Sequence, residues 1–439
     1  MRAQSPCCGE FETASRLSRR RFLAALAATT GAAVATSMFG DAVVSSAFGA
    51  TSTAGAGSGN VLVVLSLRGG IDGLGLVVPH GDPGSYAARP TLAVPAGSLL
   101  AADAMFGLHP QLAPLQWLWD QGSLAAVHAV GLPVPNRSHF SAMEEIEDAD
   151  PTSSTRRGWV NRMIGLPTGT GASDAPQQAV QLGSSIVPTE LYGPAPVLAA
   201  GDLDQITLVG ADTGTDPAWA ARRRRSLDQV WAGTAGSGTP ALRSAYRSAL
   251  TVVDTLAPVA RRTYTPTVTY PRAWPATDLS DALKDTARLI KADLGTDVVA
   301  IDYGSWDMHA DYGTLGYGRM QSMTAGLAGA LDAFLRDLGP LRERVTLVTI
   351  SEFGRRTHEN GNRGLDHGWG NVMLLAGAGV KGGRYYGTWP GLGTGPDDDL
   401  AVTTDYRNVF GEILASRFPD RTLSKVFPAF TCRPLGLMA

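Results

Sequence analysis

Residues 61–74 read VLVVLSLRGGIDGL, an apolar run that ends in a turn with two adjacent glycines. The five successive apolar residues Val61–Leu65 predict a strand buried on both faces, as in the parallel sheets of α/β proteins. The two glycines allow the backbone to turn tightly after this strand. The turn leaves Arg68 and Asp72 at the rim of the predicted sheet, where they can contact a ligand, although a purely structural glycine turn is the alternative.

The same pattern recurs along the chain. Further apolar runs predict strands at Leu124–His128, Val298–Asp302, Val345–Ile350 and Val372–Ala376. Three-to-four spacing and capping signals predict helices at Pro110–Trp119, Ser141–Asp148, Asp281–Lys291, Ser322–Leu338 and Asp405–Arg417. This alternation predicts an α/β fold with a mostly parallel central sheet and helices on both faces. Residues 151–275 are less regular, and we interpret them as an insertion or cap within a domain that spans residues 61–439.

The composition is that of a globular protein. The chain has 439 residues, of which 44% are hydrophobic and 18% are charged, and its formal net charge is −3. No extended basic surface for nucleic acid is therefore expected. The basic run Arg222–Arg225 is interpreted as a solvated helix face, with contact to an anionic surface as the alternative.

The N-terminal segment predicts export of the folded protein. Residues 18–23 read SRRRFL and precede an Ala-rich stretch, which is typical of a signal for the twin-arginine translocase. We expect a signal peptide over residues 1–50, a Gly/Ser/Ala linker over residues 51–60 and a periplasmic or secreted protein without a stable membrane span. An uncleaved anchor is disfavoured because the core is mainly Ala, Thr and Gly. Processing would leave Cys432 as the single cysteine, so no internal disulfide is expected.

Two polar loops after predicted strands suggest a metal site, since open α/β sheets bind ligands at the carboxyl ends of their strands. Asp307 and His309 follow one strand two residues apart, which places both side chains on one side of an extended backbone. Glu352 follows a second strand, and Asp366 with His367 lies in a Gly-rich loop further on. Oxygen and imidazole ligands together suit divalent metals, so these five residues are the candidate ligands.

Arginine and serine residues provide candidate catalytic groups. Arg355, like its neighbour Arg356, can clamp an anionic oxygen, although an ion pair between Arg355 and Glu352 that braces the loop is the alternative. Ser138, beside Arg137 and His139, is a candidate nucleophile. The candidate catalytic residues are therefore Ser138, His139, Arg68 and Arg355. Ser141 with Glu144 forms a capping box instead.

A set of strings that spans nearly the whole expected mature chain carries a family resemblance. They are VLVVLSLRGGIDGLGLVVPHGDP (61–83), RPTLAVP (89–95), HAVGLP (128–133), RSHF (137–140), WDMH (306–309), SEFGRR (351–356), DHGWGNVML (366–374) and VKGGRYYGTWP (380–390). In this order they resemble an exported bacterial family called domain of unknown function 1501. That family looks like a divergent branch of the alkaline phosphatase and sulfatase superfamily, whose members use one or two divalent metals on phosphate and sulfate esters.

The resemblance implies an alkaline-phosphatase-like fold and a set of roles. Ser138 or Ser141 would lie near the nucleophile position, Asp307 and His309 would form the Asp-then-His pair, and His367 would be the late histidine. Two positions depart from the family pattern. The first acid would fall near residues 66–68, where only Asp72 is close, and Glu352-Phe353 stands in place of an Asp-His pair. One metal ion is therefore expected rather than two.

These observations lead to a functional hypothesis. We expect hydrolysis of an anionic phosphate or sulfate ester with a divalent ion (Zn, Mn, Fe, Ca or Mg), and Ser138 or water as the attacking group. Arginines, with Arg68, Arg137, Arg355 and Arg356 as candidates, would replace the second ion. The alternative is an exported binding or surface-assembly protein that kept the fold and lost turnover. A Ser-His-Asp acyl hydrolase is less favoured, because the chain has no G-x-S-x-G elbow.

Overall fold

The computed structural model describes residues 34–39, 42–47, 59–166, 175–206, 217–233 and 240–439. Its centre is an 11-stranded sheet with the strand order β1-β2-β8-β7-β9-β3-β10-β11-β6-β12, in which β13 also pairs with β6. The strands are β1 (Val34–Phe39), β2 (Ala42–Ala47), β3 (Val61–Ser66), β6 (Leu124–Gly131), β7 (Ala179–Leu182), β8 (Val197–Ala200), β9 (Val298–Asp302), β10 (Val345–Ile350), β11 (Asn371–Gly377), β12 (Arg384–Tyr386) and β13 (Thr404–Asp405). Strands β8, β7, β9, β3 and β10 are parallel neighbours, which confirms the predicted mostly parallel sheet.

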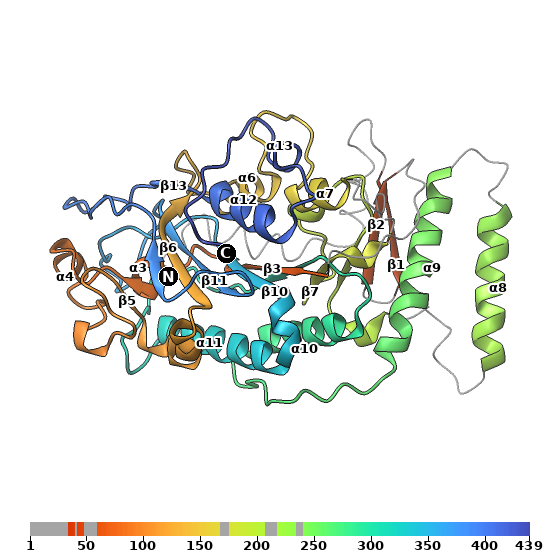
Figure 1. Cartoon of the computed structure of the whole chain (residues 1–439), viewed down its shortest axis with the longest axis horizontal. Helices are drawn as coiled ribbons and strands as arrows, with labels where there is room; N and C mark the ends of the chain where they lie inside the picture. Colours follow the sequence, from red (N-terminus) through yellow and green to blue (C-terminus); the bar gives the residue numbers. More distant parts are fainter. Residues whose placement is uncertain (1–33, 40–41, 48–58, 167–174, 207–216, 234–239) are drawn as a thin grey trace, which may run out of the picture.

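Helices cover both faces of this sheet (Figure 1). On one face lie α10 (Thr277–Ala292) and α11 (Arg319–Asp337), and on the other lie α6 (His139–Asp148), α7 (Trp159–Ile164), α12 (Tyr406–Arg417) and α13 (Leu423–Val426). Strand β3 contributes side chains to the apolar clusters on both faces of the sheet, because alternate side chains of a strand point to opposite faces. Val63 belongs to the apolar cluster that contains the α10 and α11 residues, whereas Val64 belongs to the cluster of the other face.

Several short elements lie between β3 and β6 in the chain. They are α3 (Gly73–Leu76), β4 (Val77–Val78), α4 (Gly84–Ala88), β5 (Gly107–Leu108) and α5 (Gln116–Asp120). Two of them, β4 and β5, form a separate two-stranded sheet. The helix predicted at Pro110–Trp119 divides into a 3₁₀ segment, Pro110–Leu115, followed by α5. Pro114 lies inside the 3₁₀ segment and has no N–H to continue an α-helical ladder.

Residues 151–275 differ from the insertion or cap that the sequence suggested. This stretch supplies β7 and β8, and β7 pairs with β9 within the central sheet. Its later part supplies α8 (Pro217–Gly233) and α9 (Pro240–Ala260), at the right of Figure 1, and α9 packs on the sheet through Val252 and Leu256, which belong to the apolar cluster of the α10–α11 face. Short strands of four residues between loops gave too weak a pattern to be recognised in the sequence.

The predicted twin-arginine motif lies outside the described residues, and so does most of the predicted linker. Within the predicted signal segment, β1 and β2 pair with each other, and β2 also pairs with β8 at the edge of the sheet. In the described parts of the chain no helix is long and apolar enough to cross a bilayer. The export signal and its cleavage stay predictions; cleavage after residue 50 would remove these two strands.

The loops after β3 and β9 approach each other so closely that only glycine fits at position 69. Gly69 has φ +110°, and a Cβ atom there would lie 2.7 Å from the amide nitrogen of Asp307 and 2.9 Å from that of Trp306. The polar loop of β9 thus packs directly on the glycine turn of β3. The absence of a side chain at Gly69 therefore allows the backbone of Asp307 to lie against the β3 loop.

Substituting Gly69 is expected to disturb both loops. Gly69→Ala forces a methyl group into backbone at a positive φ, and we expect a loss of at least about 2 kcal/mol in the free energy of unfolding. Gly97→Ala is the matched control, because nothing lies within 4 Å of a Cβ atom at that position and its φ is not positive. Chemical denaturation of the two variants checks this; equal stabilities would contradict it.

Candidate functional site

Four parallel strands end at the same edge of the sheet and carry the candidate residues in the loops that follow. Strand β3 leads to Arg68 and Gly69, and β9 leads to Asp307 and His309. Strand β10 leads to a long loop that holds Glu352, Arg355 and the Asp366-His367 pair, and β6 leads to His139 at the start of α6. Residues far apart in the sequence therefore meet because the topology brings these strand ends together.

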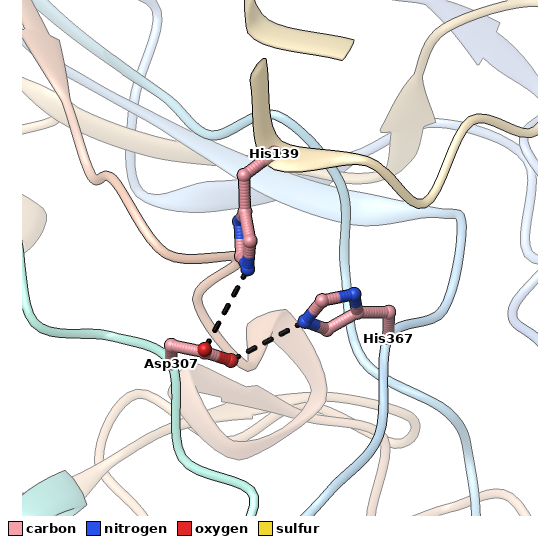
Figure 2. Close-up of side chains that lie close together, drawn as sticks. All are labelled: His139, Asp307 and His367. Carbon is pink, nitrogen blue, oxygen red and sulfur yellow. Dashed lines mark hydrogen bonds and ion pairs between the residues drawn. The ribbon is translucent and has the colours of Figure 1, made fainter. Parts of the chain in front are cut away.

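Asp307 lies at the centre of a cluster of three imidazoles, two of which are drawn in Figure 2. Its Oδ1 atom lies 3.1 Å from Nε2 of His309 and 3.3 Å from Nε2 of His367. Its Oδ2 atom lies 3.6 Å from Nε2 of His139. The Nε2 atoms of His309 and His367 are 3.0 Å apart.

Each imidazole is oriented by a hydrogen bond at its other nitrogen. Nδ1 of His139 bonds to the carboxylate of Glu352 (2.7 Å), and Nδ1 of His309 bonds to that of Asp366 (2.9 Å). Nδ1 of His367 bonds to the backbone carbonyl of Arg137 (2.9 Å). These outer bonds direct all three Nε2 atoms at Asp307. The same arrangement, a histidine held from behind by a carboxylate or carbonyl, orients the ligands of protein metal sites.

The donor set fits a divalent metal ion. His139, Asp307 and His367 each offer an atom within 4.8 Å of the others, and they form the one such group found in the described residues. Nε2 of His139 is buried and, among the described residues, has no hydrogen-bond partner, although Oδ2 of Asp307 lies 3.6 Å away. Two nitrogens bound to one tetrahedral Zn²⁺ lie about 3.3 Å apart, close to the separation between His309 and His367.

Arg355 connects three loops of the site through hydrogen bonds. Its side chain is 1% exposed and lies 2.7 Å from Oδ1 of Asp307. The guanidinium also donates to the carbonyl oxygens of Gly69 and Gly70 in the β3 loop, Trp306 in the β9 loop and Leu365 in the β10 loop. One planar cation with five donors thus crosses three loops.

The electrostatics of the cluster centre on Asp307. Burial raises the pKa of Asp307, but the three imidazoles and Arg355 outweigh it and hold that pKa well below its usual range. Burial lowers the pKa of His139, but Asp307 and Glu352 outweigh it and raise it to about 9. Burial is the largest influence on His367 and lowers its pKa. A carboxylate, a neutral imidazole and an imidazolium therefore coexist in the metal-free cluster at neutral pH.

A cleft of about 670 Å³ opens beside the cluster. His139, Asp307 and Glu352 form part of its wall, and Phe140 with Met143 adds an apolar side. Arginine side chains line it as well. Of these, Arg68 is held by Asp302 and Glu147, each at 2.6 Å.

Arg319, the first residue of α11, was missed by the sequence analysis. Its guanidinium donates to the carbonyl of Ser305 at 2.7 Å, and no ion pair with a carboxylate is found for it in the described part of the chain. A cation in the first turn of a helix opposes the helix dipole, which is the signal that could have identified it. Ser305 itself has φ +75°, a strained value of the kind that clusters at functional sites.

The structure separates the predicted residues by position. Asp307, His309 and His367 lie together, and His139, predicted as catalytic, joins them. Glu352 and Asp366 hold the outer nitrogens of histidines. The proposed ion pair of Glu352 with Arg355 is absent from the ion pairs described, because Arg355 pairs with Asp307 instead.

The predicted serines and the first acid lie outside the cluster. Ser138 occupies the N-cap of α6 without a side-chain cap hydrogen bond and is exposed, directly before His139. The capping-box prediction at Ser141 differs, because α6 begins at His139 and the Ser141 hydroxyl accepts from Asn136 at 2.9 Å. Asp72 does not replace the missing first acid: it is buried against Arg89 and Tyr312, each at 2.6 Å.

Comparison with known proteins agrees with part of the resemblance. Residues 285–416 match the model of a family described as "Protein of unknown function (DUF1501)". The matched segment runs from α10 to α12 and contains the loops after β9 and β10, with Asp307, His309 and His367. No curated protein sequence matches the chain.

Two solved structures are similar at low scores. The C-terminal periplasmic domain of EcEptC from Escherichia coli, in complex with Zn, has 10% identity and a TM-score of 0.28, covering 73% of each chain. The PsFucS1 sulfatase from Pseudoalteromonas sp. has 12% identity and a TM-score of 0.27, covering 74% of this chain and 64% of its own. Both scores are far below the level at which a substrate or mechanism can be carried over.

Removing Arg355 is expected to destabilise the protein strongly. Arg355→Met removes a fully buried guanidinium from the partly exposed Asp307 carboxylate and from the carbonyls of three loops, and we expect a loss of at least about 3 kcal/mol in the free energy of unfolding. Arg356→Met is the matched control, since Arg356 pairs with the exposed Asp397 and should matter by less than about 1 kcal/mol. Urea denaturation of both variants measures the difference, and similar losses would show that Arg355 does not hold the loops.

Proposed function

We propose that this protein is a metal-dependent hydrolase of phosphate or sulfate esters, with one divalent ion held by His139, Asp307, His309 and His367. The observation that carries the proposal is the convergence of three imidazole Nε2 atoms on one carboxylate, each imidazole being oriented from behind. In the described residues, Nε2 of His139 has no hydrogen-bond partner and lies 3.6 Å from Oδ2 of Asp307, which leaves this nitrogen free to bind an ion.

The donor set also limits which metal would bind. Three imidazoles with one carboxylate suit zinc, iron or manganese, whereas calcium and magnesium prefer oxygen ligands throughout. When bound, such an ion supplies Lewis-acid stabilisation of the negative charge that develops on an ester oxygen during hydrolysis.

Arginines at the rim provide the anion-binding part of the proposal. Arg319 lines the cleft, and its hydrogen-bond partners within the described residues are backbone carbonyls, so its charge is available to an anionic ester. Arg68 is already neutralised by Asp302 and Glu147 and is held rigidly at the cleft wall. We assign Arg319 the direct contact with the anionic group and Arg68 a positioning role.

The attacking group is either the Ser138 hydroxyl or water. Ser138 is adjacent to His139 in the chain, but its exposed hydroxyl makes no side-chain hydrogen bond with the described cluster. Water is therefore favoured over Ser138, and a Ser138→Ala variant that keeps its turnover would agree with water.

One observation favours the non-enzymatic alternative. Arg355 lies 2.7 Å from Oδ1 of Asp307, the atom also approached by His309 and His367. A cluster neutralised by this guanidinium and by an imidazolium can persist without a metal, as a binding protein that has lost turnover would require. Metal content separates the two functions.

Metal and turnover are expected to disappear together. Protein purified with its native metal should carry about one equivalent of a transition metal by mass spectrometry and hydrolyse 4-nitrophenyl phosphate or 4-nitrophenyl sulfate. Asp307→Asn and His367→Ala should each lose more than about 90% of both. His80→Ala is the control, because His80 bonds to the carbonyl of Asp103 outside the cluster. Wild-type protein without metal or turnover would favour the binding alternative.

Metal affinity is expected to rise with pH up to about 9. The raised pKa keeps His139 protonated in the metal-free protein at neutral pH, and a ligand nitrogen must lose that proton. Loss of this proton should increase the apparent affinity about tenfold per pH unit below pH 9, and the increase should level off above pH 9. The pKa of His309 is also raised, so loss of a second proton can make the increase steeper. Competition with a chelator measures this. Glu352→Gln removes a partner carboxylate, so the levelling point should move to lower pH; an affinity independent of pH from 7 to 9 would contradict the assignment of His139.

A further inference from the structure

A second cavity adjoins the cleft at Arg319. It has a volume of about 630 Å³, and Arg319 lines it as well as the cleft beside the imidazole cluster. The loop between β9 and α11 forms one wall, and Trp274, before α10, belongs to another. A ligand bound at the cluster can therefore extend past Arg319 into this cavity.

Two aromatic side chains in this cavity are unusually exposed. Trp274 is 70% exposed and Tyr317 is 68% exposed, although large aromatic side chains are normally buried for the most part. Both line the same cavity. Exposed aromatic surface that gathers in a concavity is typical of ligand binding, whereas isolated exposed residues need no explanation.

The turn that presents Tyr317 is held rigidly. The amide of Thr314 donates to the carbonyl of Tyr317 at 2.7 Å. Gly313 and Gly318 pack backbone against backbone, since a Cβ atom on Gly313 would lie 2.4 Å from the Cα atom of Gly318. The ring of Tyr317 is thus displayed by a fixed turn, which lowers the entropy lost when a ligand binds.

Charged side chains line the cavity beside the two aromatic rings. Asp311 and Arg363 are exposed, have φ +55° and +56°, and project from loops joined by the hydrogen bond from the Tyr312 amide to the Arg363 carbonyl (3.2 Å). A carboxylate and a guanidinium beside two aromatic faces match the chemistry of a sugar, whose C–H face stacks on aromatic rings and whose hydroxyls bond to planar polar groups.

We infer that this cavity binds a saccharide. Together with the cleft, it identifies the substrate class as an anionic ester carried on a carbohydrate, with Arg319 between the sugar and the ester. The saccharide site is inferred from the aromatic and charged side chains of the cavity alone. The substrate class rests on the proposed function.

Binding to a glycan array tests the saccharide site. The probes are neutral, sulfated and phosphorylated oligosaccharides, and the tightest binder is then titrated calorimetrically into the metal-loaded full chain. Trp274→Ala and Tyr317→Ala should each weaken binding at least tenfold. Trp219→Ala is the matched control, because Trp219 is also exposed but lies on α8 outside the cavity, and it should bind like the wild type. Thermal melting of each variant verifies that it is folded.

The outcomes separate this inference from the proposed function. Trp274→Ala should still hydrolyse a 4-nitrophenyl ester, which is too small to need the second cavity. Turnover of that ester without glycan binding, or glycan binding that both aromatic variants retain, would overturn the saccharide site and leave the hydrolase intact. Glycan binding that depends on Trp274 and Tyr317 in a protein without turnover would support the saccharide site and reject the hydrolase.

Discussion

The candidate site depends on one buried cation. Arg355 joins the carbonyls of the β3, β9 and β10 loops and faces the carboxylate of Asp307. The carboxyl ends of parallel strands have no ladder of hydrogen bonds beyond the sheet, so another group must hold their loops in register. A guanidinium is suited to this, because its donors point in several fixed directions within one plane. The desolvation of this charge is offset only while Asp307 and the carbonyls remain in place.

The ion pair with Arg355 also determines how Asp307 uses its two carboxylate oxygens. Asp307 uses one oxygen toward Arg355, His309 and His367 and the other toward His139. A second group of metal ligands is not found among the described residues, and Glu352 is directed at His139 and the amide of Gly69. The number of metal ions that the site binds stays a prediction.

Arg319 lines both the cleft beside the imidazole cluster and the aromatic cavity. Its position at the start of α11 is unfavourable for the helix, and it is anchored by the carbonyl of a strained residue, Ser305. Such local costs are tolerated where a side chain is needed for function. Since Arg319 lies between the cleft and the aromatic cavity, it is the side chain through which the ester site and the proposed saccharide site would act on one ligand.

The sequence by itself determined the alternation of buried strands and helices, because burial on both faces requires continuous apolar runs such as Val61–Leu65. It also indicated which polar residues follow the strands, including Asp307, His309 and His367. It did not indicate that His139 joins them, that Arg355 is buried beneath them, or that Arg319 lines two cavities, and it missed β7 and β8. These features come from contacts between segments up to 286 residues apart in the chain, which strand order and loop packing decide. No local pattern of residues encodes such distances, so only the tertiary structure could assign them.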